Sequence, residues 1–393
     1  MKISWQSKVV NPSLPTFLDG YIRGRKSEEI HDDITLQVLL IQSKETIAII
    51  TLDVLLIDET LKEQVQKLLV NNCGLKEENI LITASHTHSA PQISSFLFPN
   101  QSYNKSYRQQ IIDSIEEMVK SGLTQMIDAN MSYKKVDTHK FYSNRDSQKL
   151  PYNPWSYIVR FCDDSGKVIV DILNFLCHPT VLHAENIAVS TDLIGGIRKA
   201  YNQPLMILLG ECGDVSTRFT RKKSSFAEVA RLSQEISEQL KSGTWQALSS
   251  DELSVQTLVF DNTYHPSEDQ FLLKSQQKLQ LLVQQDENCQ PLLEHLTNRL
   301  KQSTQTMHLQ ATVVKLGELA MVFLPCEIAY ALGKELREVK DKILVVGYTN
   351  GFLGYAVNQD AYEQIAESLI SEIPYGQADK IFHSLAQTLL KLK

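Results

Sequence analysis

The sequence predicts a mixed α/β fold, with one large domain over residues 1–393 in which mixed sheets are flanked by helices. Two observations predict it. Short apolar runs rich in β-branched residues alternate along the chain with longer segments of helical periodicity. No interdomain linker, low-complexity tract or internal repeat is visible between them.

The sequence predicts three pairs of strands joined by short turns. In three places an apolar run, a short polar or glycine turn and a second apolar run indicate a hairpin. These predicted hairpins cover residues 34–57, 156–177 and 311–325. Single buried strands are predicted at residues 79–85, 204–210 and 342–351.

Helices are expected between and after these strands. Residues 59–74 and 226–243 show helical spacing that stops on glycine, and residues 328–339 continue from the third hairpin. The polar, glutamine-rich zone 262–308 is also expected to be helical, as an excursion that could act as a lid.

The composition excludes several classes of partner. A formal net charge of −7 gives no basic surface for nucleic acid or for an anionic membrane. No apolar run approaches the roughly 18 residues of a transmembrane helix, and the N-terminus shows no signal-type apolar region. The six cysteines lack CxxC spacing, so reduced thiols and a cytoplasmic location are expected. The sequence indicates no oligomeric state.

Two histidines follow the predicted strand 79–85. If residues 86–88 stay extended, His86 and His88 project to the same side, because alternate residues of a strand share a face. Such a pair suits one metal ligand beside one acid or base. The alternative is that the two imidazoles only form hydrogen bonds inside the core.

Two further strand ends carry groups of the same kind. His178 ends the second hairpin and precedes a proline, which favours extended backbone. Glu327 follows the apolar end of the third hairpin, where a buried carboxylate needs a partner. A cation is one candidate, and the amides of the following helix are the other. His265 also precedes a proline, and no role is assigned to it.

Six sequence blocks resemble, in the same order, motifs of the neutral ceramidases, which are zinc amidohydrolases that cleave N-acylsphingosines. HTHSAP is similar to HTHSGP of that family, NRDS to NRSP, CHPT to HPT and GDVS to GDVSPN. LPCEIAYALGKELRE is similar to PGEFTTMAGRRLRE, and GFLGYAVNQDAYE to YAGYVTTREEYA. The resemblance therefore implies the neutral-ceramidase fold and hydrolysis of a linear amide bond, in ceramide or a related lipid or small N-acyl compound.

The resemblance also implies roles for single residues. A Zn²⁺ ion would be bound by the family's four ligand positions, which fall on His86, His178, Glu327 and Tyr355. His88 inherits the role of general acid and base.

Three more residues of the matching motifs have roles that stay open. Arg145 would orient the substrate or stabilise the developing oxyanion. Ser216 would bind substrate or, with a base beside it, act as a nucleophile, and it could also be only a turn residue. Asp214 could fix the tautomer of a ligand histidine.

The sequence departs from the family at several positions. Ala90 replaces a glycine, and Arg218, if it faces the pocket, would favour a carboxylate or phosphate on the substrate. Glu367 lies at or beside the position of the family's second, catalytic tyrosine, while Tyr375 resembles a later tyrosine. The sequence also lacks the secretion signal and the C-terminal immunoglobulin-like domain of larger members, so only the catalytic domain is expected.

Two other functions stay open at this stage. The first is a zinc esterase or peptidase-like hydrolase of a small polar substrate, and the second is a non-catalytic binding protein on the same scaffold. His183 is an alternative metal ligand that no family motif covers.

Overall fold

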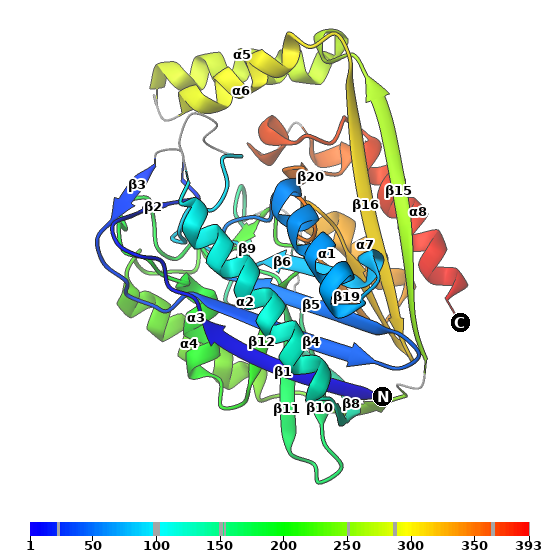
Figure 1. Cartoon of the computed structure of the whole chain (residues 1–393). Coiled ribbons are helices and arrows are strands. Elements are labelled where there is room, and N and C mark those ends of the chain that lie inside the picture. Colours follow the sequence, from blue (N-terminus) through cyan, green and yellow to red (C-terminus); the bar gives the residue numbers. More distant parts are fainter. Residues whose placement is uncertain are drawn as a thin grey trace.

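Three sheets form the body of the chain, and each has the same order of elements (Figure 1). The mixed α/β class predicted from the sequence is confirmed. The structure is a computed structural model, which describes residues 1–21, 24–96, 103–148, 152, 155–249, 252–285, 289–362 and 366–392.

Each sheet belongs to a unit with the same order of elements along the chain. The unit contains a first strand, a hairpin, a helix, a strand parallel to the second hairpin strand, and a further helix. The first unit comprises β1 (Lys2–Val9), β4 (Thr35–Gln42), β5 (Thr46–Leu52), α1 (Glu59–Cys73), β6 (Ile80–Ala84) and α2 (Lys105–Thr124), with β7 (Ile127–Asp128) at its edge. The second comprises β8 (Asn130–Asp137), β10 (Trp155–Cys162), β11 (Val168–Phe175), α3 (Asp192–Ala200), β12 (Leu205–Leu209) and α4 (Phe226–Leu240), with β14 (Gln246–Leu248) at its edge. The third comprises β15 (Leu253–Tyr264), β16 (Gln305–Leu316), β17 (Leu319–Phe323), α7 (Tyr330–Val339), β19 (Ile343–Val346) and α8 (Gln377–Lys391).

The repeated order follows from local chain geometry. Antiparallel strands can be joined by a tight turn, whereas a parallel strand needs a crossover, which a helix supplies in each unit. The three hairpins, the three single strands and the helices predicted from the sequence are therefore confirmed, and the structure adds that the single strands pair in parallel. The threefold arrangement itself was not visible as a sequence repeat.

The loops of each unit lie mainly at one end of its strands. The second hairpin strand and the parallel strand end there, because they run in the same direction. The connection from the first strand to the hairpin lies there as well, because the first hairpin strand starts where the second ends. We call this side of the molecule the carboxyl edge.

The three sheets meet at the carboxyl edge through backbone hydrogen bonds. Ala84 N–H donates to the Tyr348 carbonyl at 3.2 Å, and Gly347 N–H donates to the Leu209 carbonyl at 3.0 Å. The segment after β19 thus joins the ends of β6 and β12, which come from the other two sheets. Loops from all three units are held close together.

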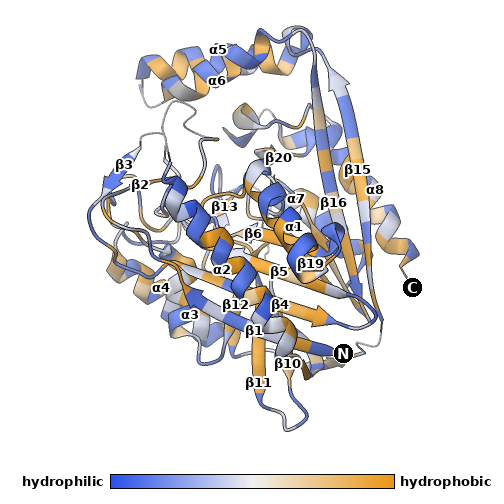
Figure 2. Cartoon of the chain, viewed as in Figure 1, coloured by the Kyte–Doolittle hydropathy of each residue, from blue (hydrophilic) through white to orange (hydrophobic). Residues whose placement is uncertain are grey.

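Apolar residues lie in the strands and on the inner faces of the helices, as Figure 2 shows for β4, β5 and β11. Helix α1 begins after Asp58, whose side chain accepts a hydrogen bond from Leu61 N–H, and it ends at Gly74 in the left-handed conformation. Within the described residues, no helix combines the length and the apolar character needed to cross a bilayer.

The zone 262–308 contains two helices, which confirms its predicted helical character. They are α5 (Gln270–Gln285) and α6 (Gln290–Leu300), and they lie beyond the long β15–β16 ribbon (Figure 1). The two ends of the zone, however, belong to these strands, because the ribbon pairs continuously as far as Tyr264 and Gln305.

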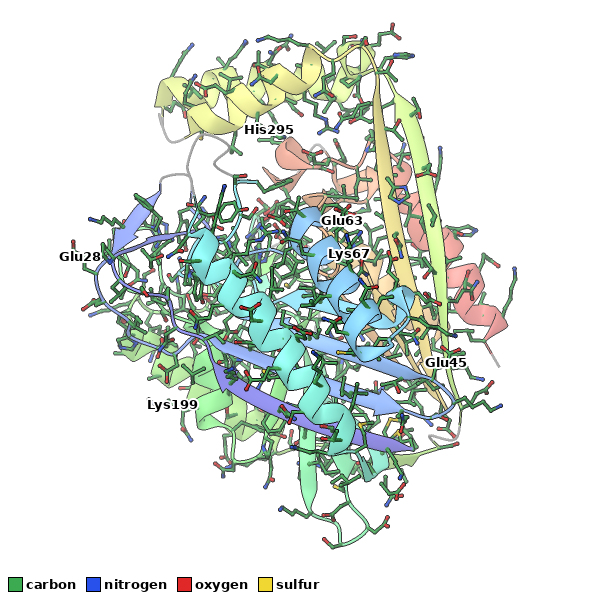
Figure 3. The ribbon with its side chains drawn as sticks, in the orientation of Figure 1. Glu28, Glu45, Glu63, Lys67, Lys199 and His295 are labelled. Carbon is green, nitrogen blue, oxygen red and sulfur yellow. The ribbon has the colours of Figure 1, made fainter. Side chains whose placement is uncertain are left out.

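Helix α6 is fastened to the segment before α8. The Arg299 guanidinium donates to the Ser371 carbonyl at 2.7 Å and to the Glu372 carbonyl at 3.1 Å. His295, labelled on α6 in Figure 3, lies 3.0 Å from the Glu372 carboxylate. The buried Arg299 also bonds Tyr264 of the ribbon, so it is the main polar tie between the helical pair and the body.

We expect Arg299→Met to loosen α6 without unfolding the protein. Its loss leaves the Ser371 and Glu372 carbonyls without this donor, at a cost of about 1–3 kcal/mol. Hydrogen exchange should therefore become at least about tenfold faster in α6 and remain unchanged in β4 and β5. Arg231→Met is the control, because Arg231 bonds only carboxylates of its own helix in the described structure. Unchanged hydrogen exchange in α6 would show that the hydrogen bonds of Arg299 do not hold this helix in place.

Candidate metal centre

His86 lies at the carboxyl edge, two residues after β6. The strand ends at Ala84, and His86 has a φ of 56°, so residues 86–88 are not extended as the sequence analysis expected. The left-handed turn instead directs the imidazole inward. Its Nδ1 donates to the Leu55 carbonyl at 2.7 Å, and Leu55 follows β5 of the same unit.

His178 repeats this arrangement in the second unit. It follows β11, is fully buried, and its Nδ1 donates to the Cys212 carbonyl at 2.5 Å. Cys212 follows β12, so a loop after the parallel strand again meets a loop after the hairpin. Its Nε2 accepts no hydrogen bond from the described residues.

Glu327 comes from the third unit and lies beside Tyr355. The two residues are paired in a short parallel ladder of β18 (Glu327–Ile328) and β20 (Tyr355–Ala356). Glu327 Oε2 lies 2.9 Å from His178 Nε2 and 3.3 Å from His86 Nε2. Tyr348, after β19, donates its hydroxyl to the same oxygen at 3.3 Å.

A cation between these groups would balance the contacts. A carbonyl can only accept, so Nδ1 carries the proton in both His86 and His178, and Nε2 presents a lone pair to the carboxylate. Burial lowers the pKa of His178 to about 4, which keeps its imidazole neutral.

The spacing of these atoms fits a metal ion. Two donor atoms at about 2.0 Å from a tetrahedral ion lie about 3.3 Å apart. The two nitrogen–oxygen distances of 2.9 and 3.3 Å are close to this spacing. Nitrogen and oxygen donors of this kind suit zinc and other divalent transition ions.

His88 lies beside the cluster but is held differently. Its Nε2 is 3.2 Å from His86 Nε2, and with His86 and His178 it forms a group that could hold a metal ion. Unlike those two, its Nδ1 meets no backbone carbonyl among the described residues, and its side chain is less buried. Burial lowers the pKa of His88 well below its usual value, so the ring is neutral and can accept a proton.

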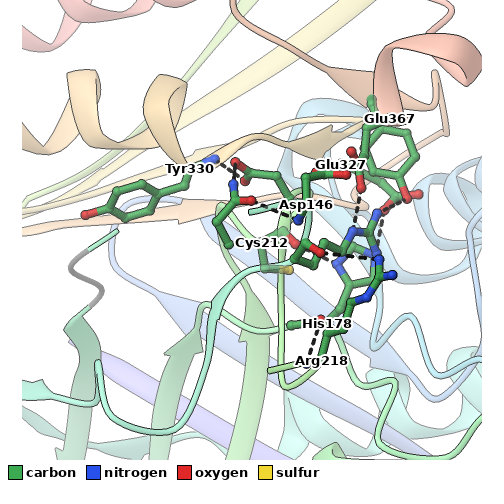
Figure 4. Close-up of polar contacts among 12 residues, drawn as sticks. Asp146, His178, Cys212, Arg218, Glu327, Tyr330 and Glu367 are labelled. Carbon is green, nitrogen blue, oxygen red and sulfur yellow. Dashed lines mark hydrogen bonds and ion pairs between the residues drawn. The ribbon is translucent and has the colours of Figure 1, made fainter. Parts of the chain in front are cut away.

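Arg145 reaches the same place from the connection between β8 and β10. It follows β9 (Ser143–Asn144), and its Nη2 donates to the Tyr355 hydroxyl at 2.9 Å. Its Nε donates at 2.5 Å to Glu367, which is labelled in Figure 4. The Arg145 guanidinium therefore links Tyr355, which lies beside Glu327, to the carboxylate of Glu367. Burial raises the pKa of the Tyr355 hydroxyl well above its usual value.

Asp214 does not bond a ligand histidine, so the role expected from its motif is wrong. Its carboxylate accepts from Tyr330 N–H at 2.7 Å and from Asn144 Nδ2 at 2.9 Å, while its carbonyl accepts from Arg145 N–H at 2.8 Å. Asp214 thus positions Arg145 and the start of α7. The ligand tautomers are fixed by backbone carbonyls instead.

Ser216 and Arg218 form a turn at the rim. Ser216, in β13 (Val215–Ser216), is buried and accepts from Arg218 N–H at 3.1 Å, which fits a turn serine. No hydrogen bond joins its hydroxyl to a histidine in the described part of the chain. Arg218 is exposed and donates to the Arg145 carbonyl at 3.4 Å (Figure 4).

Three other residues singled out in the sequence lie elsewhere. His183 is exposed and bonds Glu185, and His265 bonds the Ser303 carbonyl beside the helical pair. Tyr375 stacks on Phe271 of α5, with ring centroids 3.6 Å apart. None of these three contacts the cluster of His86, His178 and Glu327.

Sequence reasoning missed three residues that shape the site. Tyr348 contacts Glu327, and its ring lies 4.4 Å from that of His86. Arg25 donates to the carbonyls of His88 and Asp19, which fixes the loop that carries His88. Gly20 has a φ of 105°, and a Cβ there would lie 2.5 Å from His88 Cα. Tyr348 lies inside the predicted strand 342–351 and Arg25 beside none of the predicted strands, so only tertiary contacts reveal their partners.

Comparison with known proteins supports these observations. Residues 20–203 match the family model described as neutral/alkaline non-lysosomal ceramidase, N-terminal. No curated protein sequence matches the chain.

Two solved structures share the fold. The crystal structure of neutral ceramidase from Pseudomonas aeruginosa has a TM-score of 0.78 and 14% sequence identity, and the match covers 100% of this chain and 74% of that one. A ceramidase complexed with C2 has a TM-score of 0.76 and 13% identity, with the same coverage. The resemblance to the neutral ceramidases is thereby confirmed: the family model matches residues 20–203, and the fold extends over the whole chain.

We expect the purified protein to bind about one divalent metal ion per chain through this cluster, with Zn²⁺ as the probe. His178→Ala and Glu327→Gln should each weaken the affinity at least about tenfold, because each removes a donor. Calorimetric titration of the metal-free protein measures this directly. His265→Ala is the control, since His265 is exposed and bonds only near the helical pair. Equal affinities in all four proteins would exclude the cluster as the binding site.

Proposed function

We propose that this protein, with the neutral-ceramidase fold and that family's N-terminal sequence over residues 20–203, is a zinc-dependent amidohydrolase. Its substrate would be ceramide or a related N-acyl compound. A cytoplasmic location, expected from the sequence, stays a prediction. The observation that carries the proposal is the convergence of two imidazoles and one carboxylate from three separate units.

His86, His178 and Glu327 would hold the ion, with Tyr355 as the fourth ligand. The support for Tyr355 is its register opposite Glu327 and its hydroxyl's contact with Arg145. Because that hydroxyl accepts from Arg145, its own proton is directed elsewhere. A bound zinc ion supplies a water of lowered pKa and polarises the substrate carbonyl.

His88 would move the proton. Its neutral ring lies next to His86, where it can accept a proton from the attacking water and pass it to the departing amine. An amide nitrogen is a poor leaving group, so this transfer is needed for the C–N bond to break. Arg25 and Gly20 keep the loop of His88 in place.

Arg145 and Ser216 would act on the substrate side of the cluster. The Arg145 guanidinium, bonded to Tyr355, would present N–H donors where the oxyanion develops. Ser216 would line the site as a turn residue, since its hydroxyl bonds Arg218 N–H rather than a base. The helical pair of α5 and α6, joined to the segment of residues 371–372, would act as a lid.

We expect zinc-loaded protein to hydrolyse N-acyl amides and a chelator to abolish this activity. His88→Asn should lower kcat by about 10²–10³-fold while zinc remains bound, because it removes proton transfer but no ligand. His265→Asn serves as the control for the loss of an imidazole. The measurements are steady-state kinetics and metal content of the same samples.

Three outcomes would contradict the proposal. Loss of zinc in His88→Asn would make His88 a ligand. Cleavage of acyl esters but not of amides would favour the esterase. Zinc binding with no turnover of either would favour the binding protein.

A further inference from the structure

Glu367 is a second buried carboxylate close to the metal centre. It lies in the short helix Ala366–Ile370 and is 5% exposed. One of its oxygens, Oε1, accepts from Arg145 Nε at 2.5 Å. This is the residue that stands at or beside the position of a tyrosine in the resembling family, so the site carries a negative charge where the family has a neutral hydroxyl.

The second oxygen of Glu367 is unused by the protein. Oε2 is buried and accepts no hydrogen bond from the part of the chain that the structure describes. Arg145 lies between Glu367 and Tyr355, and Tyr355 lies opposite Glu327. One guanidinium therefore separates Glu367 from Tyr355, which is proposed as a ligand of the ion.

This carboxylate changes the charge that a substrate meets. The guanidinium of Arg145 would attract anions, but its charge is balanced by Glu367. Arg218 does not add a positive charge beside Glu367, because it is exposed and donates to the backbone carbonyl of Arg145. A buried carboxylate with a free oxygen favours a hydrogen-bond donor and repels another carboxylate.

We infer that Glu367 selects the substrate by accepting a hydrogen bond from a hydroxyl or ammonium group next to the scissile amide, and that it excludes substrates with a carboxylate there. The inference rests on the proposed amidohydrolase function and narrows its substrate class. It reverses the expectation that Arg218 favours an anionic substrate.

The test compares three substrates with one acyl chain and different amine parts: an N-acylethanolamine, an N-acylethylenediamine and an N-acylglycine. Wild-type protein, Glu367→Gln and Glu372→Gln are assayed with each. Glu372 is a matched control, because its carboxylate lies in the same segment but pairs with His295. Binding of ethylenediamine and of glycine to the metal-free proteins is measured by calorimetry, which needs no turnover and avoids chelation of zinc by these two molecules.

We expect wild type and Glu372→Gln to prefer the hydroxyl and ammonium substrates over N-acylglycine by at least about tenfold in kcat/KM. Glu367→Gln should reduce this preference to within about threefold and should weaken the binding of ethylenediamine, because the charge is lost while the shape is kept. A preference that persists for ammonium and not for hydroxyl would identify charge rather than hydrogen bonding as the selecting feature, and would overturn the hydroxyl part of the inference.

Other outcomes separate this inference from the proposed function. Wild type that cleaves N-acylglycine as fast as the others, or Glu367→Gln with unchanged selectivity, would overturn the inference while the amidase stands. No cleavage of any substrate, with ethylenediamine binding that depends on Glu367, would overturn the amidase and keep the selectivity. If Glu367→Gln does not fold, the wild-type preference in cleavage and binding still decides, since a preference for N-acylglycine or glycine contradicts the inference.

Discussion

The structure depends on two imidazole lone pairs that face one carboxylate oxygen. Each lone pair is fixed because the opposite nitrogen of the ring donates to a backbone carbonyl, at Leu55 for His86 and at Cys212 for His178. In this tautomer both rings direct a lone pair at the oxygen of Glu327, and a cation between them would balance the three groups. The other residues of the site are arranged around that point.

The threefold order of the sheets explains why distant residues reach this point. In each unit a loop after the hairpin and a loop after the parallel strand end at the carboxyl edge, and each unit supplies a pair of contacting groups. The pairs are Leu55 with His86, His178 with Cys212, and Glu327 with Tyr348. One member of each pair meets the cluster directly and the other orients it. The chain thus uses the same backbone arrangement three times with different side chains.

Much of the fold and part of the site could be predicted from the sequence. The hairpins and helices follow from local periodicity, and the residues after strand ends stood out because buried strands that stop on histidine or glutamate need an explanation. The left-handed turn at His86 could not be predicted, since the packing of three sheets, and not the local residues, imposes it. The same holds for Asp214, whose partners are Tyr330 and Asn144, both distant in sequence. The threefold order could not be predicted from the sequence either. The three units share the directions of their strands, and many different residues can form strands in those directions.

The central claim is that these donors bind one metal ion, with His88 outside its coordination shell. X-ray absorption spectroscopy of the zinc-loaded protein tests it most directly. The account predicts a shell of nitrogen and oxygen atoms at about 2.0 Å, with scattering from two imidazole rings. A third imidazole in that shell, or a sulfur atom at about 2.3 Å, which Cys212 could supply, would contradict it.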